Sequence, residues 1–135
     1  MTQVAKHFRK RDAILSYLRS TDTHPSADMV YARLKPEISD LSLGTVYRNL
    51  SMFRQQGAII SVGTVNGVER FDGHTSPHVH FVCNTCCAVI DMPQLGVPRQ
   101  MMEAAERQLG GTVSGCSLTL TGQCKQCSIK GGETA

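Results

Sequence analysis

Two C-x-x-C pairs constrain the fold of this chain more than any other feature of its sequence. Cys83 and Cys86 form the first pair, and Cys124 and Cys127 form the second. The pairs can meet only if residues 87–123 fold back on themselves, and four thiolates would then bind Zn(II) at about 2.3 Å in a closed tetrahedral site. Such a site would be structural and would contribute directly to folding. A four-cysteine iron–sulfur site and a redox dithiol are the alternatives.

The compartment of the chain bears on how its six cysteines are interpreted. The sequence shows no secretory leader pattern and no run approaching the ~20 apolar residues of a membrane span, so we expect a cytoplasmic protein with no membrane association. In a reducing compartment, cysteines serve as metal ligands or free thiols more often than as disulfides. Cys116 has the alternation of a core residue, and the sequence assigns no role to Cys87.

The first half of the chain predicts three helices. One spans Val4–Ser20 with Phe8, Leu15 and Leu18 near one face; a second begins after Ser26 and is stopped by Pro36. A third is capped by Ser42 and ends at Gly57. Its predicted apolar face consists of Leu43, Val46, Tyr47, Leu50 and Phe53. The residues predicted to face outward are Thr45, Arg48, Asn49, Ser51 and Arg54.

A hairpin is expected directly after the third helix. Residues 58–65 and 68–71 are rich in strand-forming residues and flank Asn66-Gly67, which is the strongest short signal for a hairpin turn. Three helices followed by such a hairpin make a winged helix-turn-helix, whose third helix enters the major groove of DNA. Residues 1–60 contain nine Lys and Arg and five Asp and Glu, a surplus of four, which favours a phosphate-binding surface in this half.

The second half predicts a small α/β domain. Strands are expected over Val79–Val82, Ala88–Met92 and Val113–Thr121, and a helix over Val97–Leu109. Three strands and one helix leave a sheet face open, so we expect a homodimer. The predicted fold class is therefore α+β. A winged-helix DNA-binding domain over residues 1–73 is followed by a hinge over 74–77. A dimerisation and metal-binding domain with a three-stranded antiparallel sheet then covers 78–129, and residues 130–135 form a disordered tail.

A second group of candidate metal ligands surrounds the predicted hinge. His78 and His80 lie two residues apart on an extended strand, so both imidazoles point to the same side. Asp72 ends the predicted wing and Asp91 ends the neighbouring strand, and these nitrogen and oxygen donors suit iron, manganese or zinc. His24, taken alone, is a turn residue. His74 also lies in this region and is read as an ordinary surface histidine.

The chain resembles the ferric uptake regulator family of bacterial metal-dependent repressors over nearly its whole length. The motifs that carry the resemblance are HPSADMVYARL, SLGTVYRNLSMFRQQG, RFDGHTSPHVHFVC and the two C-x-x-C pairs, in the order and spacing of the family. The donor set that the resemblance implies for a regulatory Fe(II) or Mn(II) ion is His24, Asp72, His78, His80 and Asp91. Three histidines and two aspartates are similar to the peroxide-sensing branch, whereas iron-sensing members usually have Glu at the position of Asp91.

The resemblance also implies how DNA would be bound. Tyr47 and Arg48 would enter the major groove, and a basic side chain from the cluster Arg9, Lys10 and Arg11 would reach the minor groove. Thr45 and Asn49 project from the same helix. The helical periodicity instead places Tyr47 on the apolar face. Either one of the two predictions is wrong, or Tyr47 packs by its ring and points its hydroxyl outward.

The function expected from these residues is that of a transcriptional repressor rather than an enzyme. The resemblance implies a homodimer that binds operator DNA when metal is bound and that senses hydrogen peroxide through Fe(II)-catalysed oxidation of His24 or His78. One alternative is an iron- or manganese-responsive repressor of metal-uptake genes with no redox step. Another is a mononuclear metallohydrolase using His78, His80 and Asp72, which the expected wing and the lack of a well-placed general base disfavour.

Overall fold

The computed structural model describes the backbone of residues 3–76, 78–96 and 98–134, and the side chains of residues 9–76, 78–96 and 98–129. The chain divides into two compact units, Met1–Thr75 and Ser76–Ala135. This division falls in the segment predicted as a hinge, of which Pro77 lies outside the described residues. In the described part of the chain, no helix has both the length and the apolar character needed to span a bilayer.

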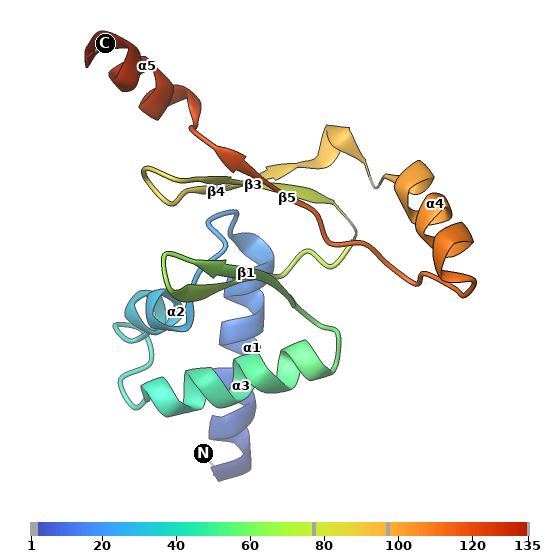
Figure 1. Ribbon diagram of the computed structural model, residues 1–135. Coiled ribbons are helices and arrows are strands. Elements are labelled where there is room, and N and C mark those ends of the chain that lie inside the picture. The colour runs from blue at the N-terminus through green and yellow to red at the C-terminus, as the bar shows by residue number, and fades with distance from the viewer. Residues whose placement is uncertain (1–2, 77, 97, 135) are drawn as a thin grey trace. The chain divides into compact units, whose positions relative to one another are not determined.

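The first unit contains the three predicted helices, α1 (Gln3–Ser20), α2 (Ala27–Leu34) and α3 (Leu43–Gln55) (Figure 1). Both predicted N-caps are confirmed. The Ser26 hydroxyl accepts a hydrogen bond from the backbone N–H of Met29, and the Ser42 hydroxyl accepts one from that of Thr45. These bonds satisfy N–H groups that have no partner within the helix, which is why each helix begins where it does.

The core of the first unit lies between the three helices and the hairpin. Ile14 and Leu18 of α1 are fully buried, whereas the side chain of Phe8 lies outside the described residues. The other buried apolar side chains are Ala27, Val30, Leu34, Ile38, Leu41, Val46, Leu50, Phe53, Ile59 and Phe71. Every helix contributes to this cluster, so the unit has a hydrophobic core of its own.

The buried face of α3 is narrower than the periodicity predicts. Val46, Leu50 and Phe53 are buried at i, i+4 and i+7, but Tyr47 is 53% exposed and Leu43 is 37% exposed. The predicted apolar positions of Tyr47 and Leu43 are therefore wrong. The helix packs against the core along one row of side chains, and residues about 100° from that row face solvent.

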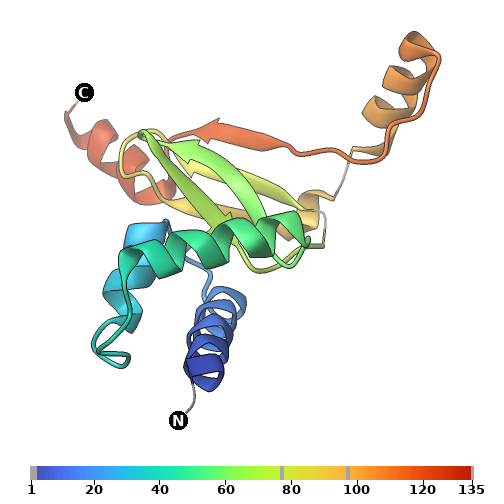
Figure 2. The same ribbon diagram turned by 90° about the horizontal axis from the view of Figure 1, so that it is seen from below.

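The predicted hairpin is present as β1 (Ile60–Val65) and β2 (Val68–Asp72), which pair antiparallel and lie side by side in Figures 1 and 2. Asn66 and Gly67 have φ of 52° and 80°. Positive φ at both central residues is the requirement of the type I′ turn, whose twist matches that of the paired strands. The Asn-Gly signal is thus confirmed.

The second unit contains a three-stranded sheet in the order β4-β3-β5, formed by β3 (Val79–Cys83), β4 (Val89–Met92) and β5 (Thr119–Gly122). β4 is antiparallel to β3, but β5 is parallel to it. The prediction of an all-antiparallel sheet is therefore wrong. Because β4 is antiparallel to β3, it ends beside the start of β3. The connection after β4 can therefore bring the chain to the start of β5 at that same end of the sheet, so that β5 runs in the direction of β3.

The third strand is also shorter than the predicted Val113–Thr121. Its pairs with β3 run from His80 with Thr119 to Cys83 with Gly122. β3 is only five residues long, so it offers no partner for the residues between Val113 and Leu118 beyond one bond from the His80 N–H to the Leu118 carbonyl at 3.2 Å.

The remaining elements are a 3-10 turn, η1 (Pro93–Leu95), and two helices, α4 (Arg99–Leu109) and α5 (Lys125–Thr134). α4 ends at Gly110 with φ of 73°, as the Gly-Gly stop predicts, and Val97 of the predicted helix lies outside the described residues. The tail predicted to be disordered over 130–135 is drawn as part of α5 up to Thr134, and Ala135 lies outside the described residues.

Candidate metal centres

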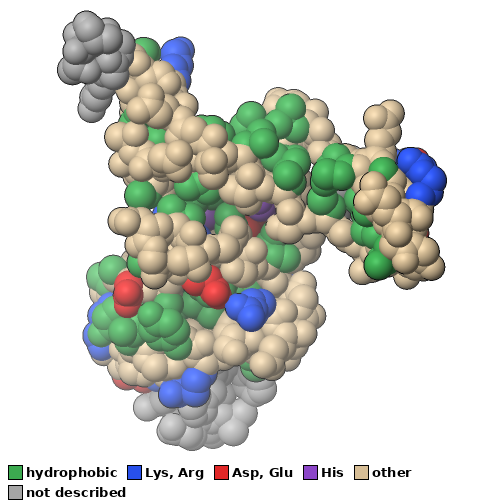
Figure 3. Space-filling model, in the orientation of Figure 1, with side chains coloured by type: hydrophobic (Ala, Val, Ile, Leu, Met, Phe, Trp, Pro, Cys, Tyr) green, Lys and Arg blue, Asp and Glu red, His purple; other side chains and the backbone are tan. Residues whose placement is uncertain are grey.

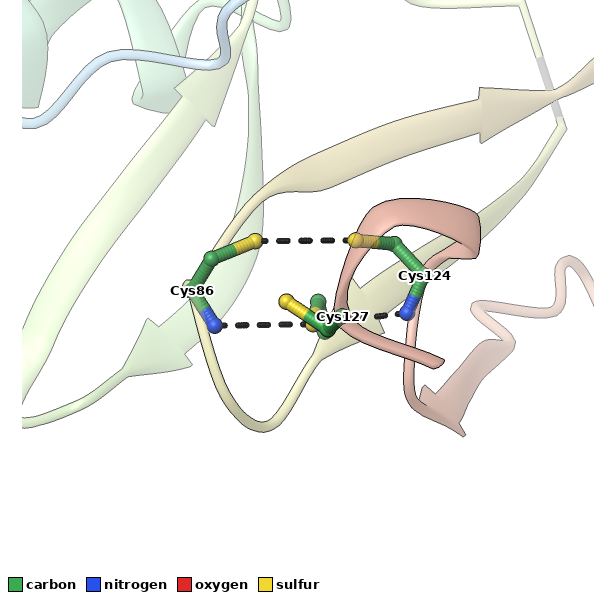
Figure 4. A group of neighbouring side chains, drawn as sticks. Cys86, Cys124 and Cys127 are labelled. Atoms are coloured by element: carbon green, nitrogen blue, oxygen red, sulfur yellow. Dashed lines mark hydrogen bonds between the residues drawn. The ribbon is translucent and has the colours of Figure 1, made fainter. Parts of the chain in front are cut away.

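The four cysteines of the two C-x-x-C pairs lie together in the second unit. Figure 4 shows three of them, Cys86, Cys124 and Cys127. Cys83 ends β3, and Cys86 follows in the adjoining turn. Cys124 follows β5, and Cys127 lies in the first turn of α5. Because β3 and β5 are parallel, the two strands end side by side, and each delivers its C-x-x-C pair to the same end of the sheet. An antiparallel β5 would have put the second pair near Val79, so the parallel pairing is what assembles the cluster.

The spacing of the sulfur atoms suits a tetrahedral ion. All four Sγ atoms lie within 4.8 Å of one another, and Cys86 Sγ is 3.8 Å from Cys124 Sγ. Sulfur atoms about 2.3 Å from a tetrahedral Zn(II) ion lie about 3.8 Å apart. The backbone N–H groups of Cys86 and Cys124 donate to Cys83 Sγ at 3.5 and 3.4 Å. The four residues therefore fit a closed zinc site.

The electrostatics of the cluster favour a bound cation. The N–H groups of Cys86 and Cys124 lower the pKa of the Cys83 thiol to about 6, because they stabilise its thiolate. The adjacent Cys124 side chain, together with desolvation, raises the pKa of Cys127 to about 12. Four thiolates at this spacing repel one another, so a divalent ion is what would allow all four to ionise at neutral pH.

Neither of the remaining cysteines belongs to this cluster. Cys87 has φ of 62°, a left-handed conformation that usually selects glycine, and its N–H donates to the Cys83 carbonyl at 3.0 Å. Cys87 thus closes the turn of the first pair through its backbone. Cys116 lies half-buried before β5.

His24 and Asp72 form a close pair within the first unit. His24 precedes α2, Asp72 is the last residue of β2, and their Nε2 and Oδ2 atoms are 3.3 Å apart. Asp72 Oδ1 also accepts a hydrogen bond from the backbone N–H of His74 at 2.8 Å. That bond orients the carboxylate and leaves its other oxygen facing the imidazole.

His78, His80 and Asp91 form a second cluster, which lies within the second unit. His80 of β3 and Asp91 of β4 are directly paired across the sheet. Asp91 Oδ1 lies 2.8 Å from His78 Nε2 and 3.3 Å from His80 Nε2, and the two imidazole centroids are 4.3 Å apart. One carboxylate oxygen therefore faces two ring nitrogens.

The hydrogen bonds of His78 constrain what can lie between its ring and Asp91. His78 Nδ1 lies 2.6 Å from the carbonyl oxygen of Ser76, which can only accept, so Nδ1 carries the proton. Nε2 of the neutral ring then presents a lone pair to the Asp91 carboxylate at 2.8 Å. Two acceptors at this distance need a cation between them, either a second ring proton or a metal ion. A carbonyl that fixes the far nitrogen of a ligand histidine is common in metal sites.

Both groups have the donor spacing of an octahedral ion. Adjacent donors about 2.1 Å from an octahedral metal lie about 3.0 Å apart. The measured separations are 3.3 Å for His24 with Asp72, and 2.8 and 3.3 Å for Asp91 with its two histidines. Imidazole and carboxylate donors suit Fe(II), Mn(II) and Zn(II).

Comparison with known proteins identifies the family of this chain. Residues 3–121 match the model of the ferric uptake regulator family. The chain belongs to that family. It is 33% identical over 123 residues to the peroxide-responsive repressor PerR of Staphylococcus aureus, covering 90% of this chain and 81% of that protein.

The solved structures that resemble this one include a peroxide stress regulator and a ferric uptake regulator. The Campylobacter jejuni peroxide stress regulator matches with a TM-score of 0.78 and 26% identity, covering 94% of this chain and 100% of that one. The Francisella tularensis ferric uptake regulator with iron matches with a TM-score of 0.74 and 26% identity, covering 95% and 93%. The fold with a winged helix-turn-helix and a small α/β unit is therefore that of the family.

The residues predicted to contact DNA lie on α1 and α3 of this family member. Arg9 is exposed on α1, whereas Lys10 is held by Asp40 through an ion pair of 3.3 Å. Arg11 lies 3.8 Å from Asp12. Lys10 therefore fastens α1 to the loop before α3, whereas Arg9 is exposed and the Arg11 side chain is 41% exposed.

On α3, the predicted contact residues form a chain of local hydrogen bonds. Arg48 Nη2 donates to the Thr45 hydroxyl at 3.1 Å, and Asn49 Nδ2 donates to the Thr45 carbonyl at 2.8 Å. Tyr47 extends beside them with more than half of its surface exposed. Arg54, predicted to point outward, pairs with Glu69 of the wing at 3.1 Å.

Sequence reasoning missed one residue that bears on the candidate centre of this family member. Arg70 of β2 donates from Nε to the carbonyl of His24 and from Nη2 to the carbonyl of Thr23 at 2.8 Å. The one sequence feature that could have indicated a role for Arg70 is its spacing. Arg70 lies two residues before Asp72 and thus on the same side of the strand. Its target lies 46 residues away in the chain, which no local pattern reveals.

Proposed function

We propose that this chain is a cytoplasmic, metal-dependent transcriptional repressor that binds operator DNA as a homodimer. The observation that carries the metal dependence is Asp91 Oδ1 facing the Nε2 atoms of His78 and His80, at 2.8 and 3.3 Å, with the far nitrogen of His78 held by a carbonyl. Membership of the ferric uptake regulator family supports the regulatory role. Zinc is proposed for the four-cysteine cluster, where it would tie the ends of β3 and β5 together.

The regulatory ion is proposed to be Fe(II) or Mn(II), held by five donors from both units. His24 and Asp72 would come from the first unit, and His78, His80 and Asp91 from the second. An ion held by both sets would favour one relative orientation of the units, and in a dimer this orientation would set the spacing of the two α3 helices. Metal would thereby control DNA binding without contacting DNA.

The proposed DNA-binding surface consists of α3, the wing and the exposed part of α1. Tyr47 and Arg48 project from α3, where an apolar ring edge can contact thymine methyl groups and a guanidinium can reach a guanine or a phosphate. Thr45 accepts a hydrogen bond from Arg48 through its hydroxyl and one from Asn49 through its carbonyl, and Thr45 and Asn49 are further proposed DNA contacts. Arg9 is the basic side chain best exposed for the minor groove, with Arg11 next to it and Lys10 engaged by Asp40.

The proposed dimer interface is one face of the sheet in the second unit. Phe81, Ile90 and Leu120 form a row across the three strands, and the outer two are each 41% exposed. α4 has no buried residue, and hydrophobic side chains gather on its surface in Figure 3. Its Met101 and Leu109 are 50% and 70% exposed. A second copy of the chain would cover this apolar surface and complete the core.

Hydrogen peroxide is proposed as the signal. Support comes from the three-histidine, two-aspartate donor set and from the similarity to two peroxide regulators. Iron(II), when bound by these donors, would catalyse cleavage of the O–O bond, with the imidazole ring supplying in total the two electrons that reduce the peroxide. One oxygen of H2O2 would be transferred to an imidazole carbon of His24 or His78 and the other would leave as water, so the ring is oxidised and the peroxide reduced. An oxidised ring is a poorer ligand, and the repressor would release its operator.

The second candidate is a repressor that responds to the iron or manganese level with no redox step. It uses the same donors, and the iron-containing Francisella tularensis regulator is a comparable structural match. The two functions differ in a single chemical outcome, which is whether the histidines gain oxygen.

Peptide mass spectrometry separates the two functions. The zinc-containing protein is loaded with Fe(II) or with Mn(II), treated with a small excess of hydrogen peroxide, digested, and fragmented to locate added oxygen. We expect one added oxygen on His24 or His78 with iron and none with manganese. His74, exposed and outside the donor set, is the internal control. Unmodified His24 and His78 in the iron-loaded protein would support the metal-level repressor.

A further inference from the structure

The backbone at His24 is in a conformation that needs external support. Its φ is 51°, in the left-handed region that non-glycine residues rarely adopt. The following residue is Pro25, which further restricts the backbone of the residue before it. The position of the imidazole depends on this φ, so a change to an ordinary negative φ would move the ring relative to Asp72.

Arg70 supplies this support from the neighbouring strand. Its guanidinium donates to two consecutive carbonyls, those of Thr23 and His24, and the adjacent N–H of Phe71 donates to the Pro25 carbonyl at 3.0 Å. Three successive loop carbonyls are thus held by two successive residues of β2. A planar guanidinium is suited to two neighbouring acceptors, whereas an ammonium group lacks the same fork.

Arg70 contacts the backbone of His24, and Asp72 contacts its side chain. They are two positions apart on β2, so their side chains leave the strand on the same side. Arg70 holds the backbone of His24, and Asp72 Oδ2 faces its Nε2 at 3.3 Å. Strand β2 therefore presents a carboxylate donor and also holds the partner imidazole in place.

We propose that Arg70 is a positioning residue for the regulatory metal centre, presetting His24 beside Asp72 before any ion binds. This inference rests on the proposed function, because it takes His24 and Asp72 to be ligands. Preorganisation lowers the ordering cost of binding, so loss of Arg70 weakens the metal affinity even though Arg70 touches no ion.

The sign of the effect separates positioning from simple electrostatics. A guanidinium near a cation site repels the cation, so if charge alone mattered, Arg70→Met would tighten metal binding. Positioning predicts the opposite. Arg70→Lys keeps the charge and can reach one carbonyl, so it should restore part of the affinity lost in Arg70→Met.

The experiment measures the Mn(II) dissociation constant of the zinc-containing protein by the electron paramagnetic resonance signal of free Mn(II). The variants are Arg70→Met, Arg70→Lys, His24→Ala and the double variant His24→Ala/Arg70→Met. Arg33→Met is the matched control, because Arg33 is exposed and pairs with Glu37 within one turn of chain. Zinc content and circular dichroism show whether each variant is folded. If Arg70→Met does not fold, the affinity of Arg70→Lys is compared with that of wild type instead.

We expect Arg70→Met to weaken Mn(II) binding by about 10–100-fold, as is typical for groups that orient ligands, and Arg33→Met to leave it unchanged. In the His24→Ala background, removing Arg70 should have no further effect, because the residue it positions is gone. Unchanged or tighter binding by Arg70→Met, or an equal loss with and without His24, overturns the inference. Unchanged binding by His24→Ala overturns the proposed function itself.

Discussion

Gly73 joins β2 to the segment that carries the second set of donors, and its lack of a side chain is required by its surroundings. A Cβ atom there would lie 2.5 Å from the carbonyl oxygen of Leu18 and 2.7 Å from the backbone nitrogen of Arg19. These are backbone atoms at the end of α1, so they cannot rotate away. A larger residue must move the strand end, including Asp72.

Gly73→Ala should therefore lower the free energy of unfolding by about 1–3 kcal/mol, the usual range for overpacking. Urea denaturation followed by circular dichroism measures the change. Gly115→Ala is the matched control, since a Cβ at Gly115 meets nothing within 4 Å. Equal stability of the Gly73 variant and the control would show that the contact with α1 is not a constraint.

Arg70 shows why part of the site is invisible in the sequence. The donor residues are recognisable because their side-chain chemistry is characteristic and His78 and His80 have strand spacing. Arg70 acts on backbone carbonyls, which every residue possesses, and it does so across 46 positions of the chain. Only the folded structure shows which carbonyls lie next to it.

At the scale of single elements, α3 separates residues that stabilise the fold from residues available to a partner. Leu50 is buried in the core, whereas Tyr47 is 53% exposed on the same helix. Tyr47→Ala should change the unfolding free energy by less than about 0.5 kcal/mol, and Leu50→Ala should lower it by about 2–5 kcal/mol.

Operator binding should depend on Tyr47 even though the stability of the fold does not. We expect Tyr47→Ala to weaken binding of a DNA duplex by about 1 kcal/mol or more, as measured by fluorescence anisotropy with the Mn(II)-loaded protein. Full affinity in this folded variant would remove Tyr47 from the proposed DNA contacts.

The elements that local chemistry determines were predictable from the sequence. Ser26 and Ser42 cap their helices through their own hydroxyl groups, and Asn66-Gly67 forms its turn through positive φ at both residues. The direction of β5 was not predictable in this way. It depends on the path of the connection after β4 and on the pairing with β3, neither of which leaves a local pattern.

The ends of β3 and β5 are proposed to depend on zinc for their order. Cys124→Ser should remove the ion and much of its apparent binding free energy, which is roughly 10–16 kcal/mol in small zinc peptides. Elemental analysis should then find zinc lost, and hydrogen exchange should find β5 unprotected while α1, α2 and α3 stay protected. Cys116→Ser, outside the cluster, should keep both zinc and protection. A Cys124 variant with full zinc content would contradict the four-cysteine site.

In the whole molecule, the proposed regulatory ion would join two units that each have their own packing. The first unit has its own core and one pair of donors, and the second has a sheet, the four cysteines and three further donors. The sequence predicted a division near residues 74–77, because a Gly, Ser, Thr and Pro composition favours a linker. A metal ion would couple the two units because its proposed donors come from both of them.

DNA binding measured as a function of Mn(II), with a duplex selected from a random pool by the Mn(II)-loaded protein, tests whether one ion joins the two units. Wild type, His24→Ala and the control His74→Ala are compared, with zinc content verified in each. We predict that wild type and His74→Ala bind only when Mn(II) is present, and that His24→Ala loses this binding while keeping zinc. Binding by His24→Ala with the same Mn(II) dependence as wild type would contradict a regulatory ion that joins the two units.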